Sequence, residues 1–295
     1  MNEYAEEDVG NIVSLEHINV QVPDQSLATL FYVVGMGFTR DPYLNVGINN
    51  MWVNVGEQQF HLPTRTPQVI AGHAGMVLPD LDVLEASLTS VAEALKGTLF
   101  SFARNFDSVL VTSPWGNRYR CYESKPEFGD MRLGIPYVEF LVPTGTAAGI
   151  LRFYQSALGA PVRSAEDQEG AFGLVQIGRH QSLRFRETNQ PIARYDGHHV
   201  AIYIANFSAP YAYLKSRGLI SEDVRNHQFR FKDIVIRRIK ITSSPSSMRY
   251  EVSNIRCTTA HLSTATLSRR KEAIGAVGMR LRLSRIDPKI LRIYL

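Results

Sequence analysis

The strongest constraint on the fold is an internal repeat: one sequence pattern occurs four times, at intervals of about 60 residues. Each copy opens with a short apolar segment typical of a strand and continues into a segment with helical periodicity. The four openings are Ser14–Pro23, Gly72–Pro79, Pro136–Pro143 and Gly197–Ile204. A chain with this repeat is expected to fold as four similar units.

The first repeat shows which elements a unit contains. His17 and Asn19 alternate with apolar residues, the period-two pattern of a half-buried strand, so both side chains are expected on one face. A helix is predicted at 26–34, and two further strands at 51–56 and 58–63. The second repeat predicts three strands after its helix, at 99–106, 108–112 and 118–122, and the fourth repeat lacks its last strand. The repeating unit therefore reads β-α-β-β-β.

One such unit alone would leave an apolar sheet face and an open sheet edge exposed, so the units are expected to pair. Consecutive repeats are taken as partners. The predicted division is an N-terminal extension at 1–12, a first domain at 13–124, a polar linker at 125–133, a second domain at 134–235 and a tail at 236–295.

The tail differs sharply in composition from the rest of the chain. Residues 236–295 hold 13 Lys and Arg against 3 Asp and Glu, and they contain no Phe or Trp. The preceding residues hold 19 basic and 25 acidic side chains, so the overall charge of +4 comes from the tail alone. Because the body is mildly acidic, the basic balance is no argument for nucleic acid binding.

Three interpretations of the tail are open. A basic arm for nucleic acid or anionic lipid is disfavoured because aromatic residues are not interleaved with the charges. A disordered extension would fit the low hydrophobicity and high charge. The favoured hypothesis is a shifted reading frame near residue 235, because codons exist for 242–267 whose shifted frame encodes a segment resembling the missing last strand.

Other features of the sequence bound its class. No apolar run approaches the roughly 20 residues that span a bilayer, and the acidic N-terminus does not have the order of a secretion signal. Cys121 and Cys257 are too few for a disulfide framework. We expect a cytoplasmic protein whose partner is a small molecule, with neither nucleic acid nor membrane as a partner. A homo-oligomer stays open.

The sequence resembles the vicinal oxygen chelate superfamily, which includes glyoxalase I, extradiol dioxygenases and bleomycin-resistance proteins. The resemblance rests on the β-α-β-β-β repeat, the opening L-E-H-I-N-V-Q-V-P, the segment G-H-A-G-M and the turn P-W-G-N, and it covers about residues 13–235. It implies an α+β fold of four β-α-β-β-β modules in two pairs, each an incomplete curved barrel flanked by helices. In the family such a pair surrounds a divalent metal.

In the first pair, the resemblance places His17, His61 and His73 at metal-ligand positions. Three imidazoles would suit Fe(II), Mn(II), Zn(II) or Ni(II) and leave positions open for substrate oxygens. The alternative is that each histidine is a hydrogen-bonded strand residue and that the protein holds no metal.

The fourth ligand position departs from the family, because Arg120 stands where a Glu is usual. A guanidinium stays protonated and cannot bind a metal. Arg120 is therefore expected to orient an anionic group of the substrate, or else to bridge to Glu57 or Glu123.

In the second pair, Glu139 and His198 are candidates for a partial metal site, although Arg184 argues against a cation there. His199 has the opposite strand parity from His198 and is expected in the core or on the surface. The expected substrate pocket includes Asn19, Trp52 and Tyr122, which are otherwise core residues.

The leading functional hypothesis is a metal-dependent enzyme of the dioxygenase or glyoxalase type, acting on a small oxygenated or aromatic compound. The alternative is a metal-free protein of the bleomycin-resistance type that binds or sequesters a small molecule.

Overall fold

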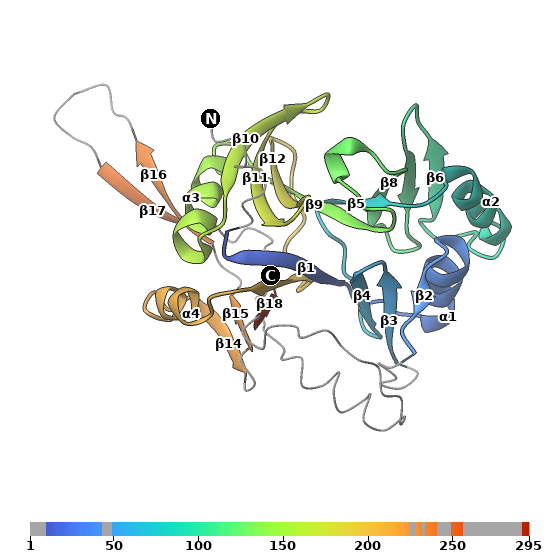
Figure 1. Ribbon diagram of the computed structural model, residues 1–295, viewed down its shortest axis with the longest axis horizontal. Helices are drawn as coiled ribbons and strands as arrows, with labels where there is room; N and C mark the ends of the chain where they lie inside the picture. Colours follow the sequence, from blue (N-terminus) through green and yellow to red (C-terminus); the bar gives the residue numbers. More distant parts are fainter. Residues whose placement is uncertain are drawn as a thin grey trace.

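The computed structural model describes residues 10–42, 49–224, 228–231, 234–240, 249–255 and 291–294 (Figure 1). Much of the tail, and the segment on which the shifted-frame hypothesis rests, lies outside these residues. The described residues form four modules in the order predicted from the repeat. The fold is α+β, with two large open sheets and few helices.

The first two modules follow the predicted pattern. The first contains β1 (Ile12–Asn19), α1 (Gln25–Ala28), the π-helix η2 (Thr29–Gly35), β2 (Thr39–Arg40), β3 (Asn50–Val55) and β4 (Gln58–Pro63). The second contains β5 (Gly72–Val77), α2 (Leu81–Val91), β6 (Ser101–Arg104), β7 (Val109–Thr112) and β8 (Arg118–Tyr122). A short 3₁₀ helix, η3 (Pro126–Phe128), lies in the segment predicted as a linker.

The third module is complete and the fourth is shorter. The third contains β9 (Gly134–Pro143), α3 (Ala147–Leu158), β10 (Val162–Asp167), β11 (Gly170–Gly178) and β12 (Gln181–Thr188). The fourth contains β13 (His199–Ile204), α4 (Ser208–Lys215), β14 (Ile220–Val224) and β15 (Gln228–Phe231). Beyond it lie β16 (Ile234–Lys240), β17 (Arg249–Ile255) and β18 (Leu291–Tyr294).

Local sequence explains where the helices begin and end. Asp80 caps α2, since its carboxylate accepts hydrogen bonds from the backbone N–H groups of Asp82 and Val83. At the end of α3, Gly159 adopts a left-handed conformation with φ of 64°, which costs glycine little. The first predicted helix differs in kind, because after one α-helical turn the chain continues as the π-helix η2.

The modules pair differently from the sequence expectation. β1 pairs antiparallel with β13, which joins the first module to the fourth in a six-stranded sheet of order β18-β13-β1-β4-β3-β2. β5 pairs antiparallel with β9, which joins the second module to the third in an eight-stranded sheet of order β10-β11-β12-β9-β5-β8-β7-β6. Alternating residues predict that each first strand has a free edge but not which other strand will cover it.

The neighbour of β13 at the sheet edge is also unusual. In the first three modules the last strand runs parallel to the first, as in β1 with β4. β18 takes the corresponding place beside β13 but runs antiparallel to it. The fourth module is therefore not completed in the way that the other three are.

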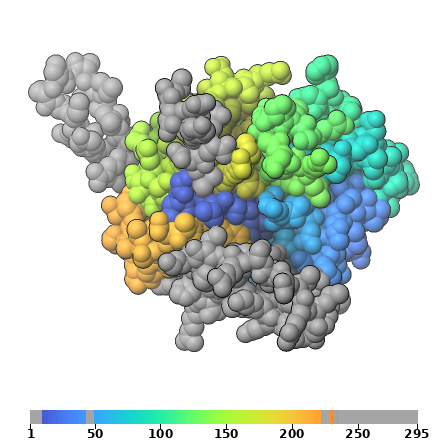
Figure 2. Space-filling model, viewed as in Figure 1, coloured from blue at the N-terminus to red at the C-terminus, as the bar shows by residue number. Residues whose placement is uncertain are grey.

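Buried glutamines connect the two sheets. The Gln58 side-chain oxygen accepts a hydrogen bond from the Ile135 backbone N–H, and the Gln181 side-chain amide donates to the Ile135 carbonyl. Gln181 also accepts from the Leu15 N–H. One apolar core extends through all four modules. In the space-filling view the fourth module (orange) lies beside the start of the first (blue), as their paired strands require (Figure 2).

Candidate functional site

Cross-strand registers bring charged and aromatic side chains to one face of the eight-stranded sheet. His73 on β5 pairs with Glu139 on β9, which pairs with Arg184 on β12. In the next row, Arg120 on β8 pairs with Gly75, and Gly75 with Tyr137. Residues in register share a face, so these five side-chain positions face the same way. The opposite face is covered by α3, where Tyr154 packs against Phe185.

A cleft of ≈1120 Å³ opens on this face. Arg120, Tyr122, Phe172 and Arg184 line it, and the residues between β6 and β7 and between β10 and β11 lie at its edges. The cleft has both aromatic walls and cationic groups, which suits a small compound with a planar apolar part and an acidic part.

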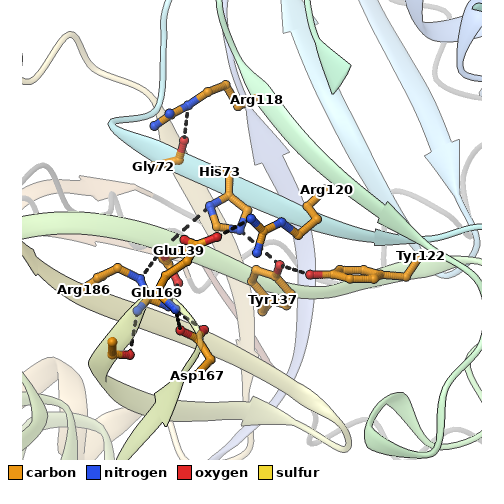
Figure 3. Close-up of polar contacts among 11 residues, drawn as sticks. Gly72, His73, Arg118, Arg120, Tyr122, Tyr137, Glu139, Asp167, Glu169 and Arg186 are labelled. Carbon is orange, nitrogen blue, oxygen red and sulfur yellow. Dashed lines mark hydrogen bonds and ion pairs between the residues drawn. The ribbon is translucent and has the colours of Figure 1, made fainter. Parts of the chain in front are cut away.

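The arginines on this face of the sheet have different partners. Arg186 makes two hydrogen bonds to the buried Glu139 carboxylate, of 2.8 and 3.0 Å, and a third of 2.6 Å to Asp167. Arg120 pairs with Glu169, which lies in the turn between β10 and β11 (Figure 3). Neither Glu57 nor Glu123, the partners considered from sequence, is the residue that Arg120 contacts.

Arg184 is the exception among these arginines. Its guanidinium carbon lies 3.6 Å from the centre of the Tyr137 ring and 5.2 Å from that of Phe172. Its Nε is buried, and the guanidinium has no hydrogen-bond or ion-pair partner among the described residues. The side chain is half-buried, and Asp167, a carboxylate that acts on it electrostatically, is bound to Arg186. The guanidinium of Arg184 is therefore available to an anion from outside the chain.

His73 belongs to a hydrogen-bond chain beside the cleft. Its Nε2 lies 3.1 Å from the Tyr137 hydroxyl, which lies 3.1 Å from the Tyr122 hydroxyl (Figure 3). Burial lowers the pKa of His73 to about 4; Glu139 opposes the shift, and Arg120 adds to it. At neutral pH His73 is therefore an uncharged imidazole that forms a hydrogen bond with the Tyr137 hydroxyl.

The six-stranded sheet carries a second group of rings. Trp52, His61, Asn19 and His199 lie in one row across β3, β4, β1 and β13. The His61 ring stacks on Trp52 at 4.0 Å, and the ring centres of His61 and His199 lie 5.8 and 5.9 Å from that of His17. His17 Nδ1 lies 2.8 Å from the Glu16 carboxylate, which fixes the orientation of the ring.

Burial lowers the pKa of His61 to about 2, with further lowering by His17 and Arg230. The imidazole of His61 is therefore neutral at physiological pH. Its Nε2 is buried and has no hydrogen-bond partner in the described part of the chain. A neutral imidazole nitrogen in this state is suited to bind a metal ion or to accept a hydrogen bond.

The structure separates the histidines that the sequence grouped together. His17 and His61 share the six-stranded sheet, whereas His73 lies in the eight-stranded sheet, because the second module pairs with the third. No group of three or more His, Cys, Asp or Glu side chains within the described ranges is placed to hold a metal ion. Asn19 and Trp52 lie with His17, while Tyr122 lines the cleft of the other sheet.

Glu139 and His198 are not brought together either. His198 stacks on Phe140 with ring centres 6.4 Å apart, and Phe140 faces away from its neighbour Glu139 on β9. The Nδ1 of His198 bonds to Asp196 at 2.7 Å. His198 precedes β13, so it is His199 that shares the row of His61, contrary to the expectation from strand parity. The turn residues Asp196 and Gly197 could have indicated this later start.

Sequence reasoning missed the carboxylates that hold the arginines. Asp167 and Glu169 lie at the end of β10 and in the turn after it, where nothing in the local pattern distinguishes them from surface residues. Their role depends on β10 lying at the edge of a sheet that also contains β8, which only the pairing of the modules determines.

Among solved structures, a glyoxalase I has a similar fold, as the sequence resemblance implied. The protein is similar to glyoxalase I from Zea mays, with a TM-score of 0.50 at 13% identity, over 89% of this chain and 90% of that one. A superfamily member from Sphaerobacter thermophilus is 21% identical, with a TM-score of 0.29, over 38% of this chain and 98% of its own. No family model and no curated protein matches the sequence.

In the described part of the chain, no helix combines the length and the apolar character needed to cross a membrane.

Proposed function

We propose that this protein binds a small anionic compound with a planar apolar part in the cleft of the eight-stranded sheet, and that Arg184 is the anchor for its acidic group. The observation that carries the proposal is the guanidinium of Arg184, which faces the cleft beside two aromatic rings and makes no hydrogen bond or ion pair with a carboxylate of the described residues. A carboxylate would form two parallel hydrogen bonds to such a group.

The same cleft is poorly suited to a metal. Arg120 and Arg184 line it, and the Glu139 carboxylate is already held by Arg186. Carboxylates also line the cleft, but those of Asp107, Asp167 and Glu169 already pair with basic side chains. A divalent cation bound there would have to displace those side chains. The proposal for this cleft is accordingly the metal-free alternative, binding or sequestration of a small molecule.

Calorimetric titration with benzoate tests the proposal. Benzoate is expected to bind wild-type protein and to lose about tenfold or more in affinity in Arg184→Gln, since a charge-assisted pair is lost. Arg152→Gln is the matched control, because it removes the same charge from an exposed position on α3. Equal affinities of wild type and Arg184→Gln would refute the role of Arg184.

A second function is favoured by one observation in the six-stranded sheet. The Nε2 atom of His61 is buried and belongs to a neutral imidazole that lies beside the ring of His17. The Nδ1 atom of His17 contacts the Glu16 carboxylate, an arrangement that orients many histidine ligands of metals. These residues fit one of Fe(II), Mn(II), Zn(II) or Ni(II), which when bound would supply Lewis-acid chemistry for an oxygenated substrate. This is the metal-dependent enzyme of the sequence hypothesis, restricted to this sheet.

Metal analysis by mass spectrometry tests this second function. Stoichiometric metal should be lost in His17→Ala and in His61→Ala and kept in His73→Ala, because His73 lies in the other sheet. Equal loss in all three variants would contradict the assignment. Absence of metal after anaerobic Fe(II) reconstitution would leave the anion-binding cleft as the only proposed site.

A further inference from the structure

The ion pair between Arg120 and Glu169 crosses from one module to the other. Arg120 lies on β8 of the second module, and Glu169 lies in the turn between β10 and β11 of the third. Both residues line the cleft, and Figure 3 shows the pair beside Tyr137. The carboxylate of Glu169 thus lies on Arg120 where an acidic group of a ligand would bind.

Arg120 and Arg184 lie on either side of one tyrosine. Arg184 lies over the ring of Tyr137, and both arginines act electrostatically on the Tyr137 hydroxyl. The ring can occupy this place because Gly75 has no side chain: a Cβ there would lie 2.3 Å from it. The two guanidinium groups therefore line one cleft, on strands that lie on either side of the strand of Tyr137.

The ion pair between Arg120 and Glu169 can be broken at low cost, so that another anion can replace Glu169. The Glu169 side chain is 43% exposed and that of Arg120 is 26% exposed, and ion pairs near the surface contribute little net free energy. By contrast, the Glu139 carboxylate paired with Arg186 is almost fully buried. Glu169 can leave Arg120 at low cost, whereas Glu139 cannot leave Arg186.

From these observations we infer that the natural ligand carries two acidic groups, one bound by Arg184 and the other replacing Glu169 on Arg120. The inference rests on the proposed anion site and adds the ligand class, a small dicarboxylate or similar dianion. Glu169 then selects between ligands, because a monoanion fills the place at Arg184 and leaves Glu169 on Arg120. Only a dianion of sufficient length exchanges with it.

Titration with a series of straight-chain dicarboxylates from malonate to adipate, beside butyrate, tests the inference. At least one dicarboxylate should bind about tenfold more tightly than butyrate to wild-type protein, and Arg120→Gln should abolish that difference without weakening butyrate. Glu169→Gln should raise the dicarboxylate affinity about three- to tenfold, since an internal competitor is removed. It should have no such effect in the Arg120→Gln background.

The control variant is Glu166→Gln, which removes the same charge from an exposed cleft position on the same hairpin. If it raises dicarboxylate affinity as much as Glu169→Gln does, general charge rather than the Arg120 pair is responsible, and the inference fails. Butyrate binding that depends on Arg184, with no gain for any dicarboxylate, overturns the inference and leaves the proposed function standing. Absence of binding by every acid, benzoate included, overturns both.

Discussion

The guanidinium of Arg184 lies 3.6 Å from the centre of the Tyr137 ring, on the strand next to it, and the hydroxyl of the same tyrosine hydrogen-bonds to His73 and Tyr122. Tyr137 thus has two separable roles. Its ring face supports the cation, and its hydroxyl joins a polar chain in the sheet.

Two substitutions of Tyr137 should separate these roles. Tyr137→Phe keeps the ring, so benzoate affinity should stay within about twofold of wild type while the free energy of unfolding falls by about 1 kcal/mol. Tyr137→Leu removes the ring and should weaken benzoate binding about fivefold or more. Calorimetry and urea unfolding measure the two quantities. Equal benzoate affinity in both variants would show that the ring does not support Arg184.

Glu139 and Arg186 form a buried ion pair whose interruption should be costly. Glu139→Gln leaves the guanidinium of Arg186 with a reduced anionic environment in the sheet, and the free energy of unfolding should fall by about 3–5 kcal/mol. Glu93→Gln is the control, because its pair with Lys96 is exposed, and it should change stability by less than about 0.5 kcal/mol. A similar small change in both variants would mean that the buried pair is not structurally important.

Gly75 allows Tyr137 to approach β5. In Gly75→Ala the new methyl group would lie between 2.3 and 2.7 Å from atoms of the ring, so the ring must move. Such overpacking should lower the free energy of unfolding by about 1–3 kcal/mol and should also weaken benzoate binding, because Arg184 loses its support. Gly75→Ala combined with Tyr137→Leu should recover much of the stability in urea unfolding. No recovery would indicate that the methyl group meets something else.

The pH dependence of stability should include a contribution from His73. An unfolded histidine takes up a proton near pH 6.5, whereas His73 in the folded protein does so only at about pH 4. Between these values the unfolded state binds more protons, so the free energy of unfolding falls as the pH is lowered, by at most about 1.4 kcal/mol per unit from this group.

Urea unfolding between pH 7 and pH 5 measures this slope. It should be smaller in His73→Gln than in wild type, and unchanged in His180→Gln, which alters an exposed histidine. A slope in His73→Gln equal to that of wild type would mean that His73 takes up its proton over the same pH range in the folded and unfolded states.

The elements of the fold were predictable from the sequence, and their partners were not. Alternation at His17 and Asn19 and the apolar stripe of α2, with Leu81, Leu84 and Leu88 buried, are local patterns, and local hydrogen bonds or capping groups enforce them. β1 could pair with the first strand of any of the other three modules, because their sequence patterns are similar. The sequence does not distinguish among these pairings. The histidine set His17, His61 and His73 assumed that consecutive modules pair, whereas His73 lies in the other sheet.

Local irregularities explain the remaining differences at the site. β13 starts one residue later than the parity of His198 suggested, which turns His199 toward His17. Glu169 lies in an exposed turn whose contact with Arg120 spans 49 residues of sequence and exists only in the assembled sheet. Arg120 could be identified as a candidate site residue from the sequence, because the resemblance places it where the family usually has a glutamate ligand.

The most direct test of the account is to locate a bound anion. Crystals soaked with 4-bromobenzoate would show the bromine by anomalous scattering. One site is expected in the cleft, with the carboxylate on Arg184 and the ring between Tyr122 and Phe172. The same soak of Arg184→Gln crystals should show no bromine there. Bromine bound only at the row of Trp52 and His61, or bound in the cleft equally well without Arg184, would contradict the central claim.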